Sequence, residues 1–256
     1  MQDLTVSLVQ TQQFWEDKQR NFHHFEKLLG NLGPTDILVF PEMFHTGFTM
    51  NTQEMAESMD GEGMNWLIHE AKRLETAVVA SLIIFEDGKY FNRMVFITPS
   101  GEVDTYDKRK LFTLAKEDEH YSSGTKNTII TYKGWKILLQ VCYDLRFPEQ
   151  CRNKVNDLQV PDYDVLLYVA NWPSRRSLHW KTLLQARAIE NQSYVIGVNR
   201  VGTDANGLDY TGDSSVINAL GTIQGQLTSD EGIVRVVLRQ AELNETRTKL
   251  NFLKDQ

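Results

Sequence analysis

KILLQVCYDLRFPE, residues 136–149, is a run of strand-forming residues that ends abruptly in a polar turn. The apolar segment 137–141 favours a buried strand, and a helix can begin at Pro148 because proline is tolerated in a first helical turn. Cys142 is therefore expected at the end of the strand, where nearby backbone N–H groups and their positive potential favour a thiolate. Two interpretations follow for Cys142: a nucleophile, or the small buried apolar residue that most free cysteines are.

Composition limits the kind of protein that the chain can be. At 256 residues, with 41% hydrophobic and 24% charged residues, the sequence predicts one globular domain over 1–256. A net charge of −7 argues against nucleic-acid binding, because the basic clusters at 108–110 and 175–176 are too short to form a basic stripe. No apolar run of 18 residues predicts a membrane span, and the first residues do not resemble a signal peptide.

The two cysteines, Cys142 and Cys151, fit no metal motif and make a disulfide framework improbable, so a reduced cytoplasmic setting is expected. No metal or organic cofactor is expected either. The predicted partner is a small-molecule substrate, with no nucleic acid and no membrane.

Hydrophobic periodicity predicts an α/β protein in which helices cover mixed sheets. The order of the elements is β-α-β-α, then hairpins, then β-α-β-α-β and further strands. Strands are expected at 4–8, 36–40, 77–85, 90–98, 103–106, 137–141, 164–170, 194–199, 214–218, 221–226 and 233–238. Helices are expected at 16–29, 63–74, 148–155 and 178–192, and loops at 51–60 and 113–127. The last 17 residues are polar with sparse apolar positions and receive no assignment.

Functional residues in such folds gather at the carboxyl ends of strands, which is where Glu42 and Cys142 are expected. A cysteine hydrolase needs a base for the thiol and donors for the oxyanion. Glu42 could take the proton and Lys108 could stabilise the negative charges, although each residue alone also has an ordinary structural interpretation. A Cys–His pair stays open as the alternative, because His45 and His120 lie near candidate loops.

Three segments resemble the catalytic signatures of the nitrilase superfamily of carbon–nitrogen hydrolases. They are FPEMF at 40–44, YDKRKLF at 106–112 and VCYDLRFPE at 141–149, and the likeness extends through 170–202 and 210–221. The resemblance implies a four-layer α-β-β-α sandwich, a homodimer, and a catalytic set that matches Glu42, Lys108 and Cys142.

The resemblance also implies a second glutamate in the loop after the lysine. Glu117 stands seven residues before Gly124, as the family pattern requires, and Glu119 is the competitor. Lys110 occupies the position where the family often has histidine, so a second cation is expected that could disturb the pKa of Lys108 or substitute for it.

Within the superfamily, CYDLRFPE and ANWPSRRS-HW resemble the omega-amidase branch, whose substrates are monoamides of short dicarboxylates such as α-ketoglutaramate and α-ketosuccinamate. A substrate carboxylate requires a cation, preferably a bidentate arginine. Arg146 is the matching position, and Arg175 or Arg176 are alternatives. Arg146 could instead pair with Asp144 or Glu149.

The remaining predictions concern the walls of the site. Trp172 is expected in the pocket wall that the family places there, and Phe44 and Tyr121 are expected to contribute in the same way. The backbone N–H of Tyr143 is expected to bind substrate, as an oxyanion donor. Asp144 is expected to cap the helix after Cys142.

Cys151 is expected to lie inert inside that helix. The alternatives at the level of function are a carbamoylase or nitrilase with the same catalytic set, a non-enzymatic binding module, and a Cys–His hydrolase of another fold.

Overall fold

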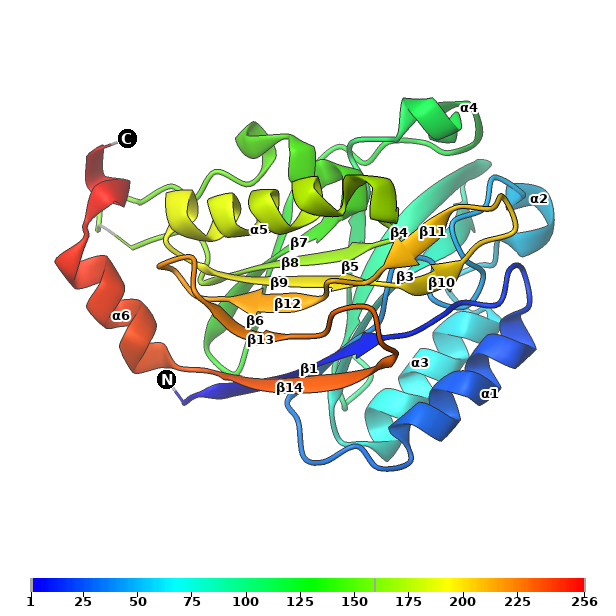
Figure 1. Cartoon of the computed structure of the whole chain (residues 1–256), viewed down its shortest axis with the longest axis horizontal. Helices are drawn as coiled ribbons and strands as arrows, with labels where there is room; N and C mark the ends of the chain where they lie inside the picture. The colour runs from blue at the N-terminus through cyan, green and yellow to red at the C-terminus, as the bar shows by residue number, and fades with distance from the viewer. Residues whose placement is uncertain (1, 159, 256) are drawn as a thin grey trace.

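Two six-stranded sheets lie face to face in the computed structural model, which describes residues 2–158 and 160–255 (Figure 1). In the first sheet the strand order is β14-β1-β2-β3-β4-β5. Its strands are β1 (Leu4–Gln10), β2 (Ile37–Val39), β3 (Ala77–Glu86), β4 (Lys89–Ile97), β5 (Val103–Asp107) and β14 (Gly232–Leu238). In the second sheet the order is β13-β12-β9-β8-β7-β6. Its strands are β6 (Thr128–Tyr132), β7 (Trp135–Val141), β8 (Val165–Ala170), β9 (Tyr194–Asn199), β12 (Ser215–Ile217) and β13 (Ile223–Gln226).

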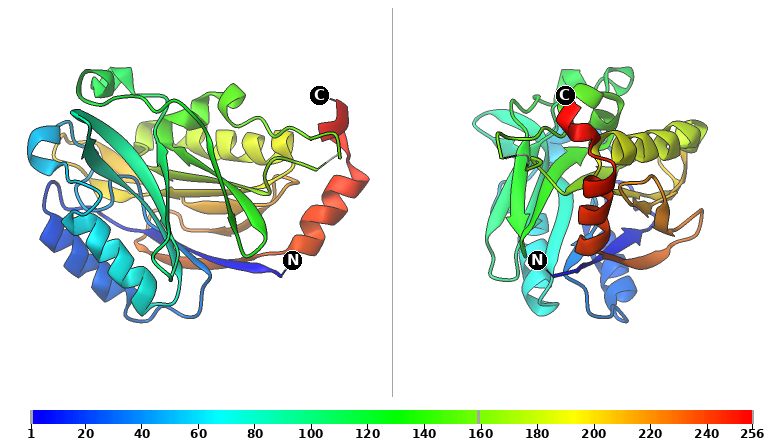
Figure 2. Two further views of the ribbon diagram at one scale, coloured as in Figure 1. Left: turned by 180° about the vertical axis from the view of Figure 1, so that it is seen from behind. Right: turned by 90° about the vertical axis from the view of Figure 1, so that its left-hand side faces the viewer.

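Helices cover the outer faces of both sheets (Figures 1 and 2). The first sheet carries α1 (Lys18–Leu29) and α3 (Glu62–Arg73) side by side, and the second carries α5 (Ser177–Asn191). The shorter helices are α2 (Thr52–Met55), α4 (Glu117–His120) and α6 (Gln240–Lys249), with 3-10 turns η1 (Thr113–Ala115), η2 (Cys142–Arg146), η3 (Pro148–Gln150), η4 (Ser174–Arg176) and η5 (Phe252–Asp255). The expected α-β-β-α sandwich is confirmed.

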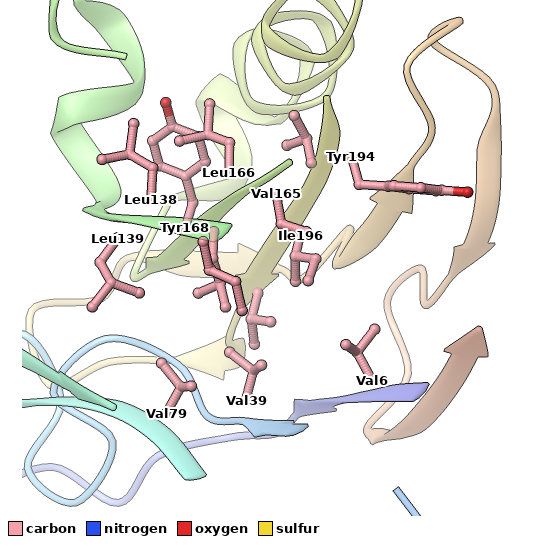
Figure 3. Packing of buried hydrophobic residues seen from close by; sticks show 14 of the residues in the cluster. Val6, Val39, Val79, Leu138, Leu139, Val165, Leu166, Tyr168, Tyr194 and Ile196 are labelled. Carbon is pink, nitrogen blue, oxygen red and sulfur yellow. The ribbon is translucent and has the colours of Figure 1, made fainter. Parts of the chain in front are cut away.

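The core between the sheets explains why the central strands read as continuous apolar runs. Val39 and Val79 of the first sheet point toward Leu139 of the second (Figure 3). The opposite face of the second sheet is buried against α5 through Trp180 and Leu184. Strands covered on both faces lose the alternation of polar and apolar residues that a half-exposed strand shows.

The strand directions bring the ends of three strands to one edge. The central strands β1, β2 and β3 are parallel, as are β7, β8 and β9. Glu42 follows β2, Cys142 follows β7 and Asn171 follows β8. The backbone N–H of Asn171 donates to Glu42 Oε2 at 2.8 Å, so the two sheets are joined at this edge.

Several sequence-based expectations about secondary structure are wrong. The loops expected at 51–60 and 113–127 contain the short helices α2 and α4. The helix expected at 148–155 is only the turn η3, and Cys151 lies just after it. Asn153 holds the following chain in an irregular path, because its side-chain amide donates to Tyr163 O and Asn191 O, both at 3.0 Å. The polar C-terminal stretch, which received no assignment, contains α6; its apolar pattern is weak because only Leu243 of this helix is a buried apolar residue.

The strand β6 and a small hairpin were also missed. The hairpin joins β10 (Val201–Thr203) to β11 (Asp209–Thr211). Its strands are too short to show an alternating pattern. Among the described residues, no helix is long and apolar enough to cross a membrane.

Candidate active site

A buried carboxylate lies at the centre of the edge where the strands end. Glu42 has no solvent exposure, and its carboxylate is held from three directions. Lys108 Nζ and Asn92 Nδ2 donate to its Oε1 at 2.9 and 2.7 Å, and Asn171 N donates to its Oε2. Met43, the next residue, has a φ of 45°, a backbone conformation that few non-glycine residues adopt. The surrounding structure therefore fixes the orientation of this carboxylate.

Lys108 lies between two buried glutamates. Its Nζ donates to Glu42 Oε1 at 2.9 Å and to both carboxylate oxygens of Glu117 at 3.0 Å. Burial by itself would lower the pKa of Lys108, but the charge of Glu117, followed by that of Glu42, outweighs it and raises that pKa well above its usual value. Lys108 is therefore a fully charged ammonium group.

The side chain of Glu117 is positioned by the loop that carries it. Phe112 N donates to Glu117 Oε2 at 2.6 Å, and Asn92 Nδ2 contacts Glu117 Oε1 at 3.2 Å. Burial raises the pKa of Glu117, Lys108 opposes that rise, and Glu42 adds to it. Asn92 thus donates to both buried carboxylates, Glu42 and Glu117.

Cys142 lies at the carboxyl end of β7 and begins η2. Its φ of 45° places the backbone in the left-handed region, which is strained for a non-glycine residue. Burial, followed by the charge of Glu42, raises the pKa of the Cys142 thiol well above the usual value. The resting cysteine is therefore a neutral thiol, and the expectation that the helix start stabilises a thiolate is wrong. A single 3-10 turn supplies too little positive potential to offset burial beside a carboxylate.

A cavity of about 510 Å³ opens in front of these groups. Lys108, Cys142, Tyr143 and Trp172 reach it, as do Phe48 and Phe112, which give it apolar walls. Asp204 is the one acidic residue in the described lining, and its carboxylate is already occupied. It accepts hydrogen bonds from Asn206 N, Leu208 N and Tyr210 Oη, each at 2.9 Å.

Three arginines line the same cavity: Arg146, Arg175 and Arg176. Arg146 lies over the Trp172 ring, with 4.6 Å from its guanidinium carbon to the ring centroid, and contacts His179 Nδ1 at 3.3 Å. Within residues 2–158 and 160–255, none of the three forms an ion pair with a carboxylate. Arg146 therefore does not pair with Asp144 or Glu149, the structural alternatives considered for it.

Asp144 connects the cysteine turn to the lysine segment. It is fully buried and accepts hydrogen bonds from Val141 N at 2.9 Å, Lys110 N at 2.9 Å and Tyr106 Oη at 2.8 Å. The expected capping role is present through Val141 N, but the other two bonds were not expected. Burial raises the pKa of Asp144 to about 6 despite these donors.

Several predicted site residues lie away from the cavity. Phe44 is fully buried among Phe22, Phe25, Phe40 and Trp66, so the expectation that it lines the pocket is wrong. An aromatic residue two positions after Glu42 turns toward α1 and α3 rather than toward the cavity. Tyr121 is also absent from the described lining, and its hydroxyl donates to Thr49 O at 2.6 Å.

The structure places the two competing charged residues, Glu119 and Lys110, away from the catalytic cluster. Glu119 is exposed beside Lys116, so Glu117 is the glutamate that contacts Lys108. Lys110 Nζ lies 3.8 Å from Glu149, on the surface, and does not replace Lys108.

The two histidines that the sequence left open contact other groups. His45 Nε2 contacts Glu57 Oε2 at 3.2 Å, and its ring stacks on Phe44. His120 is exposed at the end of α4. Neither histidine lines the cavity beside Cys142 within the described part of the chain.

Two other site residues, Asn92 and Asp204, had no signal in the sequence: Asn92 lies in β4 with no motif around it, and Asp204 comes from a segment with no predicted structure. Tyr210 lies in the segment 210–221 that resembles the family, but no role was predicted for it. No group of three or more His, Cys, Asp or Glu residues that could hold a metal ion occurs in the described ranges.

The geometry agrees with comparisons to known proteins. The family model for carbon–nitrogen hydrolases matches residues 5–248, and the chain belongs to that family. It is 41% identical to an omega-amidase, YafV, of Escherichia coli K12 over all of this chain and 97% of the relative. It is 32% identical to a 2-oxoglutaramate amidase of Bacillus subtilis over 86% of this chain and 84% of that protein.

A solved structure is similar over the whole chain. XC1258 of Xanthomonas campestris is described as a CN-hydrolase superfamily protein with an arsenic adduct in the active site. Its TM-score is 0.98 at 42% identity, and the match covers all of this chain and 98% of that one. The fold and the enzyme class are therefore those of a hydrolase that acts on carbon–nitrogen bonds.

Proposed function

We propose that the protein is an omega-amidase that hydrolyses short dicarboxylic acid monoamides, of the α-ketoglutaramate and α-ketosuccinamate class, to the dicarboxylate and ammonia. One observation carries this proposal: Lys108, Cys142 and three arginines line one cavity, the buried Glu42 accepts a hydrogen bond from Lys108, and none of the three arginines pairs with a carboxylate among the described residues. The cluster suits attack on an amide, and the arginines suit an anionic group on the same small molecule. The similarity to an omega-amidase and to a 2-oxoglutaramate amidase supports the same substrate class.

The first chemical step is acylation of Cys142. Glu42 takes the thiol proton as sulfur attacks the amide carbon, so the high pKa of the thiol makes proton transfer part of the attack. The carbonyl π electrons move to oxygen and form a tetrahedral oxyanion. Glu42 then gives the proton to the amide nitrogen, the C–N bond breaks, and ammonia leaves a thioester on Cys142.

Two donors face the oxyanion in this scheme. Lys108 Nζ contacts one oxygen of Glu42 and both oxygens of Glu117, so one ammonium proton is free for the substrate when a single N–H is shared between the two Glu117 oxygens. Tyr143 is the second residue of a 3-10 turn, so its backbone N–H has no acceptor within the turn. Removing one oxyanion donor typically costs about 2.7–4 kcal/mol of barrier.

Deacylation uses the same groups. Glu42 removes a proton from water, and the oxygen attacks the thioester carbon. Collapse of the second tetrahedral intermediate breaks the C–S bond, and the proton returns to the sulfur. Glu117 positions Lys108 throughout, since both of its oxygens contact Nζ.

Arg146 binds the distant carboxylate of the substrate in this proposal. Its guanidinium group is oriented by Trp172 and His179 rather than by an acid, so its remaining donors can face the cavity. Trp172 supplies the apolar wall beside the methylene groups. The proposed roles thus cover the catalytic and binding residues expected from the sequence, except Phe44.

The domain organisation, oligomeric state and localisation are proposed from the resemblance to the family. The chain works as one catalytic domain over 1–256, as a homodimer in the cytoplasm, with no partner beyond its small-molecule substrate. Exposed apolar side chains at Leu178, Ile189 and Leu220 agree with an interface near α5. Sedimentation equilibrium tests the homodimer, and a mass equal to one chain at micromolar concentration would contradict it.

Ammonia release from an amide panel tests the activity. The panel contains α-ketoglutaramate, succinamate, glutamine, an N-carbamoyl amino acid and a simple nitrile, each with wild type and with Cys142→Ala. Release from the dicarboxylate monoamides, abolished by Cys142→Ala, is the expected result. Release from only the carbamoyl compound or the nitrile would overturn the substrate class and leave the catalytic set in place.

A further inference from the structure

Arg176 occupies a fixed place in the cavity wall. It ends η4, directly after the loop that follows β8, and its backbone O accepts the Trp172 Nε1 hydrogen bond at 2.8 Å. Its guanidinium carbon lies 5.2 Å from the centroid of the Phe112 ring. Arg176 is therefore fixed at its backbone oxygen, and its guanidinium group lies near Phe112. Arg175, in the same turn, is exposed.

Arg176 and Arg146 share Trp172. The Trp172 ring lies under the Arg146 guanidinium, and the Trp172 indole N–H fixes the backbone of Arg176. The two cations come from different loops, one after β7 and one after β8. The same indole thus contacts the guanidinium group of Arg146 and the backbone of Arg176.

The charges around Arg176 are unbalanced. Burial, Arg175 and Arg146 all lower its pKa, and the negative charge of a Cys142 thiolate acts in the opposite direction. Arg176 and the nucleophile Cys142 line the same cavity. Asp204, the one acid of the described cavity lining, is committed to its own loop and to Tyr210, so these arginines are open to an anionic group of the substrate.

The shape of the anion follows from the donors. Two guanidinium groups offer N–H donors and no acceptor. A 2-oxo acid end presents three acceptors, the two carboxylate oxygens and the neighbouring 2-oxo oxygen. A 2-amino acid end brings an ammonium group instead, which the cations repel.

We propose that Arg176 is a specificity-determining residue that acts with Arg146 to select 2-oxo dicarboxylate monoamides over their 2-amino and unsubstituted counterparts. This inference rests on the proposed omega-amidase function. Arg146 takes the carboxylate, and Arg176 donates to the 2-oxo oxygen and to the near carboxylate oxygen.

Three amides of equal chain length test the proposal: 2-oxoglutaramate, glutaramate and glutamine. They differ only at carbon 2. For Arg176→Gln we expect KM for 2-oxoglutaramate to rise at least tenfold with a small change in kcat, because the lost contact is made equally in ground and transition states. The loss for glutaramate should be several-fold smaller, and the discrimination against glutamine should shrink.

Two further variants separate charge from geometry. Arg176→Lys keeps the repulsion of glutamine but loses the planar fork, so only the preference for the 2-oxo group should fall. Arg175→Gln removes the same charge from the neighbouring exposed residue, and its effect should be smaller and equal for the three amides. Binding of 2-oxoglutarate and glutarate to Cys142→Ala by calorimetry, with and without Arg176→Gln, measures the same preference without turnover.

The outcomes distinguish this inference from the function beneath it. If wild type releases ammonia from none of the amides, the proposed function fails. If wild type is active but Arg176→Gln changes kcat/KM for all three amides by the same factor, or changes none, the role of Arg176 is overturned. An unchanged calorimetric preference for 2-oxoglutarate would overturn it equally.

Discussion

Replacing Asp144 with asparagine changes one buried carboxylate and leaves its volume almost unchanged. In the wild type, Oδ2 accepts from Tyr106 Oη and Val141 N, and Oδ1 accepts from Lys110 N. Asparagine has one acceptor oxygen, so its NH₂ group must face a donor. An unsatisfied buried donor costs about 1–3 kcal/mol, and this cost applies at every pH.

The pH dependence of this variant follows from the raised pKa of Asp144. Burial moves that pKa from 3.8 to about 6 in the native state. The native state therefore binds more protons than the unfolded state between those values, and the free energy of unfolding falls as pH rises through this window. Two pKa units correspond to a cost of about 3 kcal/mol at pH 7. The asparagine variant escapes this cost.

The two effects predict that the stability difference between Asp144→Asn and wild type changes with pH. Near pH 4.5, Asp144→Asn should be less stable than wild type by about 1–3 kcal/mol, and near pH 7 the difference should shrink or change sign. Urea unfolding followed by tryptophan fluorescence at both pH values measures it. A stability difference that is the same at both values would refute the assignment of a titrating carboxyl to Asp144.

The same variant should lose activity. Asp144 holds Val141, which precedes Cys142, and Lys110, which lies two residues after Lys108. A small misplacement of reacting groups costs on the order of a hundredfold in rate. We expect kcat to fall by about ten- to a hundredfold with KM nearly unchanged. Tyr106→Phe is the matched control, because it removes one donor and keeps the carboxylate, and its loss should be smaller.

Three further results are expected. Glu117→Gln should lower kcat and shift the alkaline limb of the pH–rate profile to lower pH, because the Glu117 charge raises the pKa of Lys108; an unmoved limb would contradict this. Lys110→Ala should change kcat less than about twofold, since its exposed Nζ faces Glu149, and a loss as large as that of Lys108→Ala would show the role assigned to Lys108 to be wrong. Burial lowers the pKa of His45 from 6.5, so the unfolded state binds more protons below that value and stability falls with acidification. His45→Gln should reduce the difference in Tm between pH 7.5 and 5.5. An unchanged difference would argue against this contribution of His45 to the loss of stability in acid.

Most of the sheet framework could be predicted because buried strands and amphipathic helices carry strong patterns. The strand before Cys142 and the helix at 177–191 were recognised from such patterns. The helix expected at 148–155 failed because a first-turn proline signals a start and says nothing about length. The side chain of Asn153, bonded across the fold to Asn191, determines that path and leaves no local signal.

The active site likewise contains residues that the sequence indicated and residues that only contacts across the fold reveal. The family resemblance indicated Glu42, Lys108 and Cys142, and its pattern before Gly124 indicated Glu117; the structure brings all four together. Asn92 could not be predicted, because a strand asparagine becomes informative only when two carboxylates are known to meet it.

The electrostatic state of Cys142 was mispredicted for a related reason. The positive potential of a helix start can be read from sequence, but burial beside Glu42 is a property of the folded chain. Phe44 failed as a pocket residue because the family resemblance that suggested it does not show which layer a residue of the turn after β2 enters.

Trapping the acyl-enzyme tests the central claim, nucleophilic attack by Cys142, most directly. Wild type is mixed with α-ketoglutaramate, quenched in acid during turnover, digested, and analysed by mass spectrometry, with Cys151→Ser as control. The account predicts a substrate acyl group on the peptide that contains Cys142 in both proteins, and none in Cys142→Ala. Ammonia release without any adduct on Cys142, or an adduct on Cys151 instead, would contradict it.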